Sequence, residues 1–301
     1  MNAQPPIAGV VVTFHPDADF ERRLEAVARE ANPLIVIDNT AEPAVQDRLA
    51  RACGARGAQL IANEENRGLA RALNQAFAAH AHHGIEWVIA FDQDSTPEPG
   101  FSRALFATAT GDAAVTGANW RDEARPNRSA KHLRAHPVPG SFRRTVAQHD
   151  LTDVTCVITS GSLFHVPTWR ELGGFDDGLF LDLVDSDYCL RARAAGYEVR
   201  VSAEARLQHR RGAKRAVSFA GRNWWPAFMP PSRLHLLFRN RVLLFRRHAI
   251  RTPHWAVFEL AYAMKILLEI VLLENEKTAK FVACARGTWD GLRGRTGGIR
   301  M

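Results

Sequence analysis

Short apolar runs alternate with segments of helical periodicity over the first 120 residues of the chain. The apolar runs are rich in β-branched residues, and between two of them Leu69, Leu73 and Phe77 recur at the spacing of one helix face. This alternation is typical of βαβ units and predicts an α/β fold with a mostly parallel, Rossmann-like sheet flanked by helices. The predicted strands lie at 7–14, 33–39, 58–63, 87–94 and 113–119.

Polar residues follow four of these predicted strands, at 13–15, 38–39, 63–68 and 92–94. Right-handed crossovers bring the carboxyl ends of parallel strands to one edge of the sheet, and ligands of open α/β sheets bind at that edge. The sequence therefore predicts a single polar rim.

The stretch Asp92-Gln93-Asp94 ends an apolar run with two carboxylates that repel each other unless a cation lies between them. Side chains two apart on a strand point the same way, so Asp92 and Asp94 can share one cation while Gln93 points elsewhere. Oxygen ligands of this kind suit Mg²⁺ or Mn²⁺, and the alternative is a solvated turn. An EF-hand loop is excluded because Pro97 stands where glycine is needed.

Farther along the chain, residues 121–150 are polar and contain prolines, which predicts an irregular excursion over the surface. A second ordered part begins at 154–166. A short helix ended by Gly173 and Gly174 follows it, then an acidic stretch at 175–197 and a strand at 198–202.

Composition and charge narrow the choice of class. The chain has 301 residues, 46% of them hydrophobic, which is enough for a substantial core. Its four cysteines are scattered and the start lacks the features of a signal peptide, so we expect a cytoplasmic protein with reduced thiols. The net charge is +7, and between Glu204 and Glu259 there is no acidic residue but twelve Lys or Arg, which predicts an anionic partner.

A long apolar segment at 254–277 contains Glu259, Lys265 and Glu269, which fall with Glu274 on about half of the helical wheel. A charge at the centre of a bilayer costs about 2.5 to 3.5 kcal/mol, so a membrane span is disfavoured. We expect an amphipathic helix that lies on an anionic membrane surface, packs on the rest of the protein, or forms a homodimer.

The stretches "FDQDS" (91–95) and "FLDLVDSDYCLRARAAGY" (180–197) resemble the inverting GT-A-type glycosyltransferases of family 2, and most of all their rhamnosyltransferase branch. The resemblance extends over roughly residues 7–247. It implies a GT-A fold, a Mg²⁺ or Mn²⁺ cofactor, and a nucleotide-diphospho-sugar donor such as dTDP-L-rhamnose. It also implies a glycan acceptor, lipid-diphosphate-linked, in the synthesis of a surface polysaccharide such as O-antigen.

The resemblance assigns roles to individual residues. Asp92 and Asp94 become the Asp-x-Asp motif of the metal and diphosphate, with His209 as a third metal ligand. The other donor-binding positions are Thr13, Phe14, Asp38, Asn66, Gly68, Ser160, Gly161 and Arg239. The residues alone leave other readings open: a strand-end turn for Asp38, a helix cap for Asn66, and an ordinary packed or surface histidine for His209.

The general base implied by the resemblance is Asp185. The family places a Glu-Asp pair here, whereas this chain has Val184-Asp185, a departure shared with the rhamnosyltransferase pattern. Asp182 either raises the pKa of Asp185 and binds the acceptor, or simply begins a helix rich in acid. Asp187 stands four before Arg191, a spacing that favours an ion pair.

We thus predict a catalytic domain at 1–250, with a donor half at about 1–120 and an acceptor half at about 151–250, and a helical extension at 251–301. The rival hypothesis is a basic membrane-surface or nucleic-acid binding protein that uses Trp224 and Trp225 for stacking. The acidic rim argues against nucleic acid as a partner. An oxidoreductase is excluded because no Gly-x-Gly-x-x-Gly follows the first strand.

Overall fold

A computed structural model describes residues 5–122, 125–138, 140–210, 216–219 and 221–299. Its strands are β1 (Ile7–Thr13), β2 (Leu34–Asp38), β3 (Gln59–Ala62), β4 (Trp87–Asp92), β5 (Ser95–Pro97), β6 (Ala113–Asp122), β7 (Arg125–Ser129), β8 (His132–Ala135), β9 (Phe142–Thr145), β10 (Ser162–His165), β11 (Glu198–His209), β12 (Val217–Phe219) and β13 (Arg222–Trp224). The helices are α1 (Phe20–Glu30), α2 (Pro43–Gly54), α3 (Leu69–His82), α4 (Phe101–Thr108), α5 (Val166–Glu171), α6 (Val184–Ala194), α7 (Pro231–His248), α8 (Pro253–Leu273) and α9 (Lys277–Leu292), with a 3₁₀ turn η1 (Asp177–Leu179).

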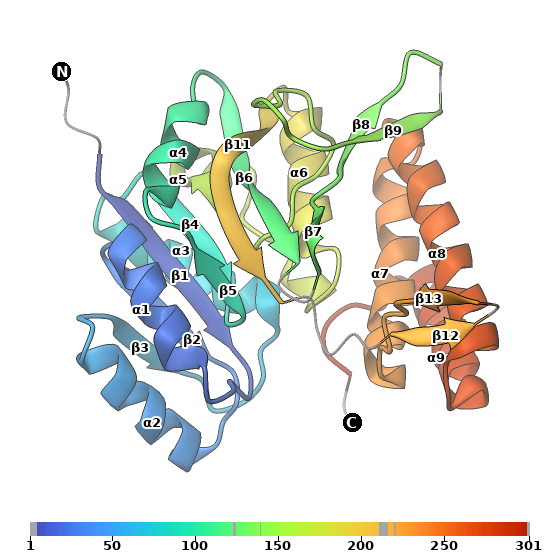
Figure 1. Ribbon diagram of the computed structural model, residues 1–301, viewed down its shortest axis with the longest axis horizontal. Coiled ribbons are helices and arrows are strands. Elements are labelled where there is room, and N and C mark those ends of the chain that lie inside the picture. Colours follow the sequence, from blue (N-terminus) through green and yellow to red (C-terminus); the bar gives the residue numbers. More distant parts are fainter. Residues whose placement is uncertain (1–4, 123–124, 139, 211–215, 220, 300–301) are drawn as a thin grey trace.

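One mixed sheet organises the body of the molecule (Figure 1). Its order in the described residues is β3-β2-β1-β4-β10-β6-β11-β5, and β7 pairs with β6. The pairs from β3 to β4 are parallel, as is β6 with β11, whereas β10 runs antiparallel to both β4 and β6. The five predicted strands are therefore confirmed, but β10 from the second half of the chain separates the fourth from the fifth.

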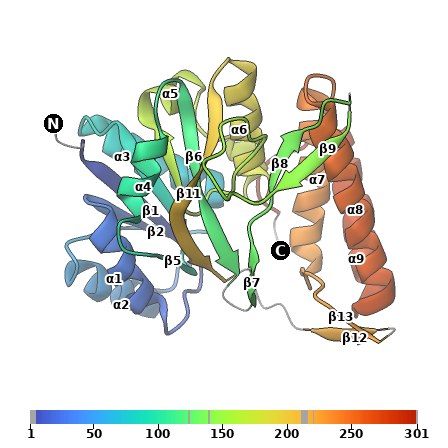
Figure 2. The same cartoon turned by 45° about the horizontal axis from the view of Figure 1, so that its top comes forward.

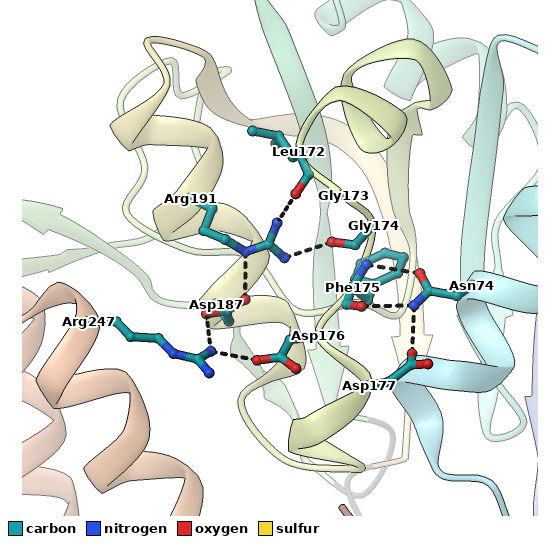
Figure 3. Close-up of a pocket in the computed structure, with 10 residues that line it drawn as sticks. All are labelled: Asn74, Leu172, Gly173, Gly174, Phe175, Asp176, Asp177, Asp187, Arg191 and Arg247. Atoms are coloured by element: carbon teal, nitrogen blue, oxygen red, sulfur yellow. Dashed lines mark hydrogen bonds and ion pairs between the residues drawn. The ribbon is translucent and has the colours of Figure 1, made fainter. Parts of the chain in front are cut away.

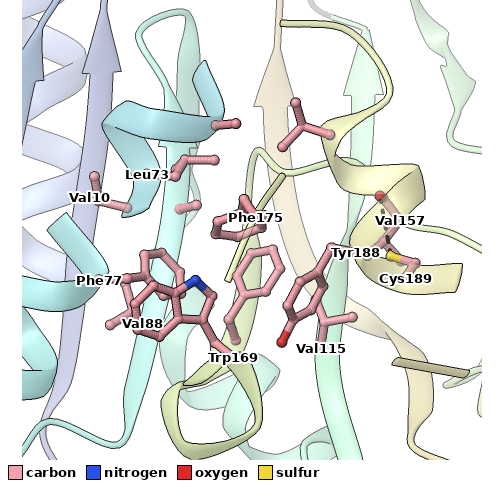
Figure 4. Packing of buried hydrophobic residues seen from close by; sticks show 14 of the residues in the cluster. Val10, Leu73, Phe77, Val88, Val115, Val157, Trp169, Phe175, Tyr188 and Cys189 are labelled. Carbon is pink, nitrogen blue, oxygen red and sulfur yellow. Dashed lines mark hydrogen bonds between the residues drawn. The ribbon is translucent and has the colours of Figure 1, made fainter. Parts of the chain in front are cut away.

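Helices cover both faces of this sheet. Buried residues of α1, α2 and α4, such as Leu24, Leu49 and Leu105, pack on one face. Those of α3, α5 and α6 pack on the other, where Phe77, Trp169, Phe175 and Tyr188 form an aromatic cluster with ring centroids 5.1–5.4 Å apart (Figure 4). Because Tyr188 lies on α6, this cluster fixes the helix that carries Asp185.

The last three helices form a separate layer at one side of the sheet (Figures 1 and 2). α7 and α9 lie against each other closely because Gly287 and Gly291 of α9 leave room for the backbone of α7. A Cβ at Gly287 would lie 2.2 Å from the carbonyl oxygen of His235. The hairpin of β8 and β9 reaches across to α8, where Phe142 meets Phe258 edge-to-face.

One expectation for these regions was wrong in detail, and another is settled in part. The stretch at 121–150 is not irregular throughout, since it continues β6 and contains β7 and the β8–β9 hairpin. In the C-terminal segment Glu259, Glu269 and Glu274 are buried, so one side of the helix packs on the protein, as one of the alternatives expected, whereas Lys265 is exposed. Glu259 pairs with Arg241, Glu269 with Lys265 and Glu274 with Lys280. Nothing tests the predicted division of the chain at about residue 250, which stays a prediction.

The basic segment between Glu204 and Glu259 has fewer arginines available to bind an anionic partner than its composition indicates. Arg239 and Arg241 are buried, and Arg233 and Arg247 have carboxylate partners. Arg211, Lys214 and Arg215 lie outside the described residues. Within the described part of the chain, none of the helices is long and apolar enough to cross a membrane.

Candidate active site

Asp92, Asp94 and His209 form a cluster at the carboxyl ends of β4 and β11. One potential ligand atom from each side chain lies within 4.8 Å of the other two. Nδ1 of His209 is 3.2 Å from Oδ1 of Asp94, and its Nε2 is 4.0 Å from Oδ2 of Asp92. The antiparallel pairing of β5 with β11 sets His209 opposite Ser95, which is how a residue so distant in sequence reaches the two aspartates.

Two serines hold this cluster in place. The Ser95 hydroxyl lies 2.9 Å from Nδ1 of His209 and 2.6 Å from the Ser160 hydroxyl. The backbone N–H of Asp92 donates to Oγ of Ser160 at 2.9 Å. The backbone N–H of Gly161 donates to the carbonyl of Ala90, so the segment that leads into β10 lies beside the cluster. The structure thus brings Ser160 and Gly161 beside the two aspartates, and the contact with the donor that the resemblance implies stays a prediction.

Gln93 points away from the cluster, as strand alternation predicts. Its side chain accepts from the backbone N–H of Phe14 at 2.8 Å and donates to the Phe14 carbonyl at 3.1 Å. Its own carbonyl accepts from Nε of the buried Arg23 at 2.8 Å. Arg23 therefore anchors the loop between the two aspartates. Sequence reasoning missed it because an arginine on the predicted α1 carries no signal of a partner 70 residues away.

The donor set of the cluster fits a divalent cation. Burial raises the pKa of Asp92, and the charge of Asp94 raises it further, while His209 and Arg233 act in the opposite direction. Oδ1 of Asp94 is buried and accepts no hydrogen bond from the described residues. Buried carboxylate oxygens left in this state suit Mg²⁺ or Mn²⁺, and an imidazole nitrogen completes a donor set that Mn²⁺ accepts.

The polar rim continues along β1, β2 and β3. The Thr13 and Thr40 hydroxyls donate to Oδ1 of Asp38 at 2.9 and 2.7 Å, and Oδ2 of Asp38 is buried without a hydrogen-bond partner in the described residues. Beside it, the Asn63 amide donates to Oδ1 of Asn39 at 2.9 Å. The prediction that the strand ends share one rim is therefore confirmed.

The start of α3 differs from the expectation for Asn66 and Gly68. Asn66 does not cap the helix: its Oδ1 accepts from the N–H of Gly68 in a local turn, and Gly68 precedes the helix with a φ of 80°. The N–H of Leu69 donates to the carbonyl of Phe180 at 2.6 Å. A Cβ at Gly68 would lie 2.5 Å from that oxygen, so glycine is needed here for the approach of residue 180.

Asp185 lies in the first turn of α6 and is partly buried. Burial raises the pKa of its carboxyl to about 6, and the negative charges of Asp182 and Asp92 contribute in the same direction. Hydrogen bonds from the backbone at Ser186 and Thr159 act against this shift. A carboxylate with a pKa close to neutral is suited to accept a proton and remains largely ionised at pH 7.

Comparison with known proteins identifies the family. The family described as "Glycosyltransferase like family 2" matches residues 5–226. The chain belongs to this glycosyltransferase family. Within it, dTDP-rhamnosyl transferase RfbF of Shigella flexneri is 26% identical over 297 residues, which cover 98% of each chain.

Solved glycosyltransferase structures share the fold. Mannosyltransferase PcManGT from Pyrobaculum calidifontis, in complex with GDP-Man and Mn²⁺, matches 96% of this chain and 76% of its own at 17% identity and a TM-score of 0.56. S. aureus TarS 1-349 matches 95% and 80% at 12% identity and a TM-score of 0.58. The predicted GT-A fold and the prediction of a glycosyltransferase are therefore confirmed.

Arg239 is buried, and its guanidinium already bonds to backbone carbonyls, which does not favour the diphosphate role that the resemblance implied. Its buried guanidinium donates to the carbonyls of Gly178 and Leu179 at 3.2 Å, and it also bonds to the Gly297 carbonyl. Arg239 therefore ties α7 to η1 and to the end of the chain. Burial, the largest influence on this arginine, lowers its pKa.

Asp182 also differs from its expected place. It lies outside α6, which begins at Val184, and it is held by Arg233 of α7. The preceding Phe180 and the following Leu183 both have positive φ, of 67° and 66°. Such conformations cost free energy for residues other than glycine and persist only where the surroundings enforce them. No sequence pattern revealed them.

Behind α6 lies a surface cavity of about 520 Å³ whose polar groups are paired with one another (Figure 3). Buried Asp187 accepts from Nε of Arg191 at 2.7 Å and lies 3.1 Å from Nε2 of His248, so the predicted pairing with Arg191 is confirmed. Burial alone would raise the pKa of Asp187, but its bond to His248 and the charges of Arg191 and Arg247 hold it below the usual value. This network fixes the orientation of α6 and with it Asp185.

Proposed function

We propose that the protein is an inverting rhamnosyltransferase that transfers L-rhamnose from dTDP-L-rhamnose to a hydroxyl of a glycan acceptor. One observation carries the proposal: Asp185, a carboxylate with a raised pKa, lies within electrostatic reach of a cluster that fits a divalent cation. The likeness over almost the full length of both chains to a protein named dTDP-rhamnosyl transferase supports the choice of donor.

In this proposal Asp92, Asp94 and His209 hold Mg²⁺ or Mn²⁺. When bound, the ion neutralises charge on the donor diphosphate. The serines contribute by position: Ser160 and Ser95 hold Asp92 and His209 through bonds of 2.9 Å, so the ligand atoms need little reorganisation. That a solved relative in fold was obtained with Mn²⁺ supports this assignment.

The chemical step then needs a single proton acceptor. The acceptor hydroxyl attacks the anomeric carbon from the face opposite the diphosphate, and the bond between that carbon and the diphosphate oxygen breaks. Asp185 takes the hydroxyl proton, and the electron pair of the broken bond leaves with the nucleoside diphosphate. One base and one departing diphosphate give inversion, because no covalent intermediate with the enzyme is formed.

The nucleotide is proposed to lie along the rim of β1 and β2, against Thr13, Phe14 and Asp38. Oδ2 of Asp38 is a buried acceptor without a donor in the described residues, which suits the imide N–H of a pyrimidine base. The backbone of Phe14 is fixed by Gln93, and its ring is exposed at the rim. Asn66 is exposed and is proposed to border the nucleotide, whereas the space over Gly68 and Gly161 is filled by Phe180 and Leu207, so these glycines would act by shaping the rim.

We further propose that the acceptor is a lipid-diphosphate-linked glycan for a surface polysaccharide, reached from the cytoplasmic face of an anionic membrane. The outer face of α8 and α9 supports this, because it exposes large apolar side chains: Val257, Leu260, Met264, Leu268, Val271, Leu272, Phe281, Val282, Trp289 and Leu292. Exposed apolar side chains in this number favour an interaction site. Lys265, Lys277 and Arg286 are exposed on the same helices and complement anionic lipid.

A panel of nucleotide-sugars tests the function directly. Metal-dependent hydrolysis, or thermal stabilisation of the protein, is measured for dTDP-L-rhamnose and for UDP- and GDP-sugars. The proposal expects the largest response with dTDP-L-rhamnose and loss of that response with a chelator. A larger response to another donor would keep the glycosyltransferase but reject rhamnose as its sugar, and a response that survives the chelator would reject the metal.

A further inference from the structure

Because the guanidinium of Arg239 is buried, another arginine of α7, Arg233, is the better candidate for binding an anion at the site. It lies in the first turn of α7 and binds Asp182 through two nitrogens, Nη2 at 2.9 Å and Nε at 3.2 Å. The Arg233 side chain is 48% exposed, whereas that of Asp182 is only 13% exposed. The guanidinium therefore faces open space on one side and a carboxylate on the other.

The charge of Arg233 also reaches the cation cluster. The pKa of Asp92 is raised overall, and the positive charge of Arg233 opposes that rise. The pKa of Arg233 is raised in turn, mostly by Asp182 and to a smaller extent by Asp92. Arg233 is held by Asp182 to the loop that precedes the helix of the proposed base, and that loop meets the rim of the sheet, because its Phe180 carbonyl accepts from the N–H of Leu69 at 2.6 Å. Arg239 cannot take this place because its guanidinium is buried among backbone carbonyls.

The ion pair of Arg233 and Asp182 is of a kind in which the arginine can exchange its carboxylate for a phosphate. A guanidinium binds a phosphate oxygen pair with the same planar fork that it uses for a carboxylate. Because the Arg233 side chain is half-exposed, solvent screens its attraction to Asp182, and the guanidinium can turn to another anion. Resting on the function proposed above, we propose that Arg233 binds the diphosphate of the donor, and that Asp182 holds it in position until the donor arrives.

The exchange has a consequence for the acceptor. When Arg233 turns to the diphosphate, Asp182 loses its partner and becomes a free hydrogen-bond acceptor three residues before Asp185. A sugar hydroxyl can then take the place of the guanidinium. Binding of the donor thereby frees Asp182 for the acceptor, so the donor binds first and the acceptor second, and no domain has to move.

Titration of nucleoside diphosphates tests the proposal, with Mn²⁺ present and with dTDP, UDP and GDP as probes. For whichever diphosphate the wild type binds best, we expect Arg233→Met to weaken affinity by about 10- to 100-fold and Arg233→Lys to weaken it less. Affinity for the corresponding nucleoside should not change. Arg246→Met, which alters an exposed arginine farther along α7, is the matched control and should bind like the wild type.

Asp182→Asn separates this role from a structural one. If Arg233 served only to hold Asp182, both substitutions would weaken binding alike; if it binds the diphosphate, Asp182→Asn should bind as tightly as the wild type or more tightly. Melting temperatures of all variants establish that they are folded. Equal diphosphate affinity of the wild type and Arg233→Met overturns the role of Arg233 alone. No binding by the wild type overturns the donor assignment and the role of Arg233 with it.

Discussion

Carboxylates are used in opposite ways in two regions of this molecule. Asp92 and Asp94 at the strand ends and Asp185 at the start of α6 are left incompletely neutralised, so that the pKa values of Asp92 and Asp185 are raised. In the C-terminal helices each buried glutamate has a cation of its own, as Glu274 has Lys280 at 2.6 Å. The apolar side chains follow the reverse pattern: they are buried under the sheet helices and exposed on α8 and α9.

The difference indicates what each region lacks. A buried charge without a partner costs free energy, and natural proteins retain it where a cation, a proton or a substrate supplies the missing interaction. An exposed apolar face likewise lacks a covering surface. We therefore expect the first region to bind ligands and the second to meet a membrane or a protein partner.

The largest effect is expected from Asp185→Asn, which removes the proposed base and keeps the shape of the side chain. Turnover should fall by about 10²–10⁴-fold while donor affinity stays within about threefold, since a base acts in the chemical step. Single-turnover transfer together with donor titration checks this. Turnover above roughly a tenth of the wild-type value would remove Asp185 from the role.

A smaller loss, in binding and not in chemistry, is expected for Asp94→Ala. Removing one carboxylate takes away a ligand and a compensating charge, so metal-dependent donor affinity should fall by about 10- to 100-fold. The matched control is Asp47→Ala, which alters an exposed aspartate of α2. If Asp94→Ala still binds the donor fully, and a chelator still abolishes that binding, the cation site lies elsewhere.

The pH dependence of transfer reports on the same carboxylate. Because Asp185 must be ionised to accept a proton and its pKa is about 6, kcat/KM should rise roughly tenfold per pH unit below that value and level off above it. Rates measured from pH 5 to pH 8 at saturating metal check the profile. A flat profile across this range would mean that a group with an ordinary carboxyl pKa is the base.

The weakest effect is expected at the outer face of α8 and α9. Leu260→Glu combined with Leu268→Glu replaces two side chains that are 58% and 55% exposed, so folding and transfer to a soluble acceptor should hardly change. Flotation of the double variant with anionic liposomes should fall several-fold at low salt. The control variant Asp47→Ala should float like the wild type. Unchanged flotation, or loss of a dimer instead, would assign this face to protein contacts.

Much of this site was predictable because the connections of a parallel sheet determine where its strands end. The apolar runs, together with the rule that parallel strands end at one edge, are enough to predict that Thr13, Asp38 and Asp92 share one rim. The spacing of Asp187 and Arg191 likewise predicts their ion pair, since one helical turn separates them.

The sequence did not predict contacts between residues that are far apart in the chain and follow no periodic pattern. Arg233 reaches Asp182, and Arg239 reaches Gly297, across more than 50 residues. Helical periodicity gathers the charges of α8 on one side, but it does not say whether that side meets water or protein. Glu259 and Glu274 are buried against Arg241 of α7 and Lys280 of α9, two cations that a helical wheel of α8 alone does not contain.

The melting temperatures of Asp185→Asn and Glu274→Gln, measured without metal, test the contrast between the two regions most directly. A carboxyl whose folded pKa of about 6 exceeds its unfolded value of 3.8 destabilises the fold when ionised. That cost is absent below pH 3.8, grows as pH rises, and is complete above pH 6. Asp185→Asn should therefore raise the melting temperature at pH 7.5, by about 2–6 °C, and leave it unchanged at or below pH 3.8.

Glu274→Gln should do the reverse and lower the melting temperature at pH 7.5, because it leaves the buried charge of Lys280 without a partner, a loss of about 3 kcal/mol. Opposite signs for the two substitutions are the predicted result. If both lower the melting temperature at pH 7.5, Asp185 is a structural carboxylate like Glu274, and the contrast between the two regions is wrong.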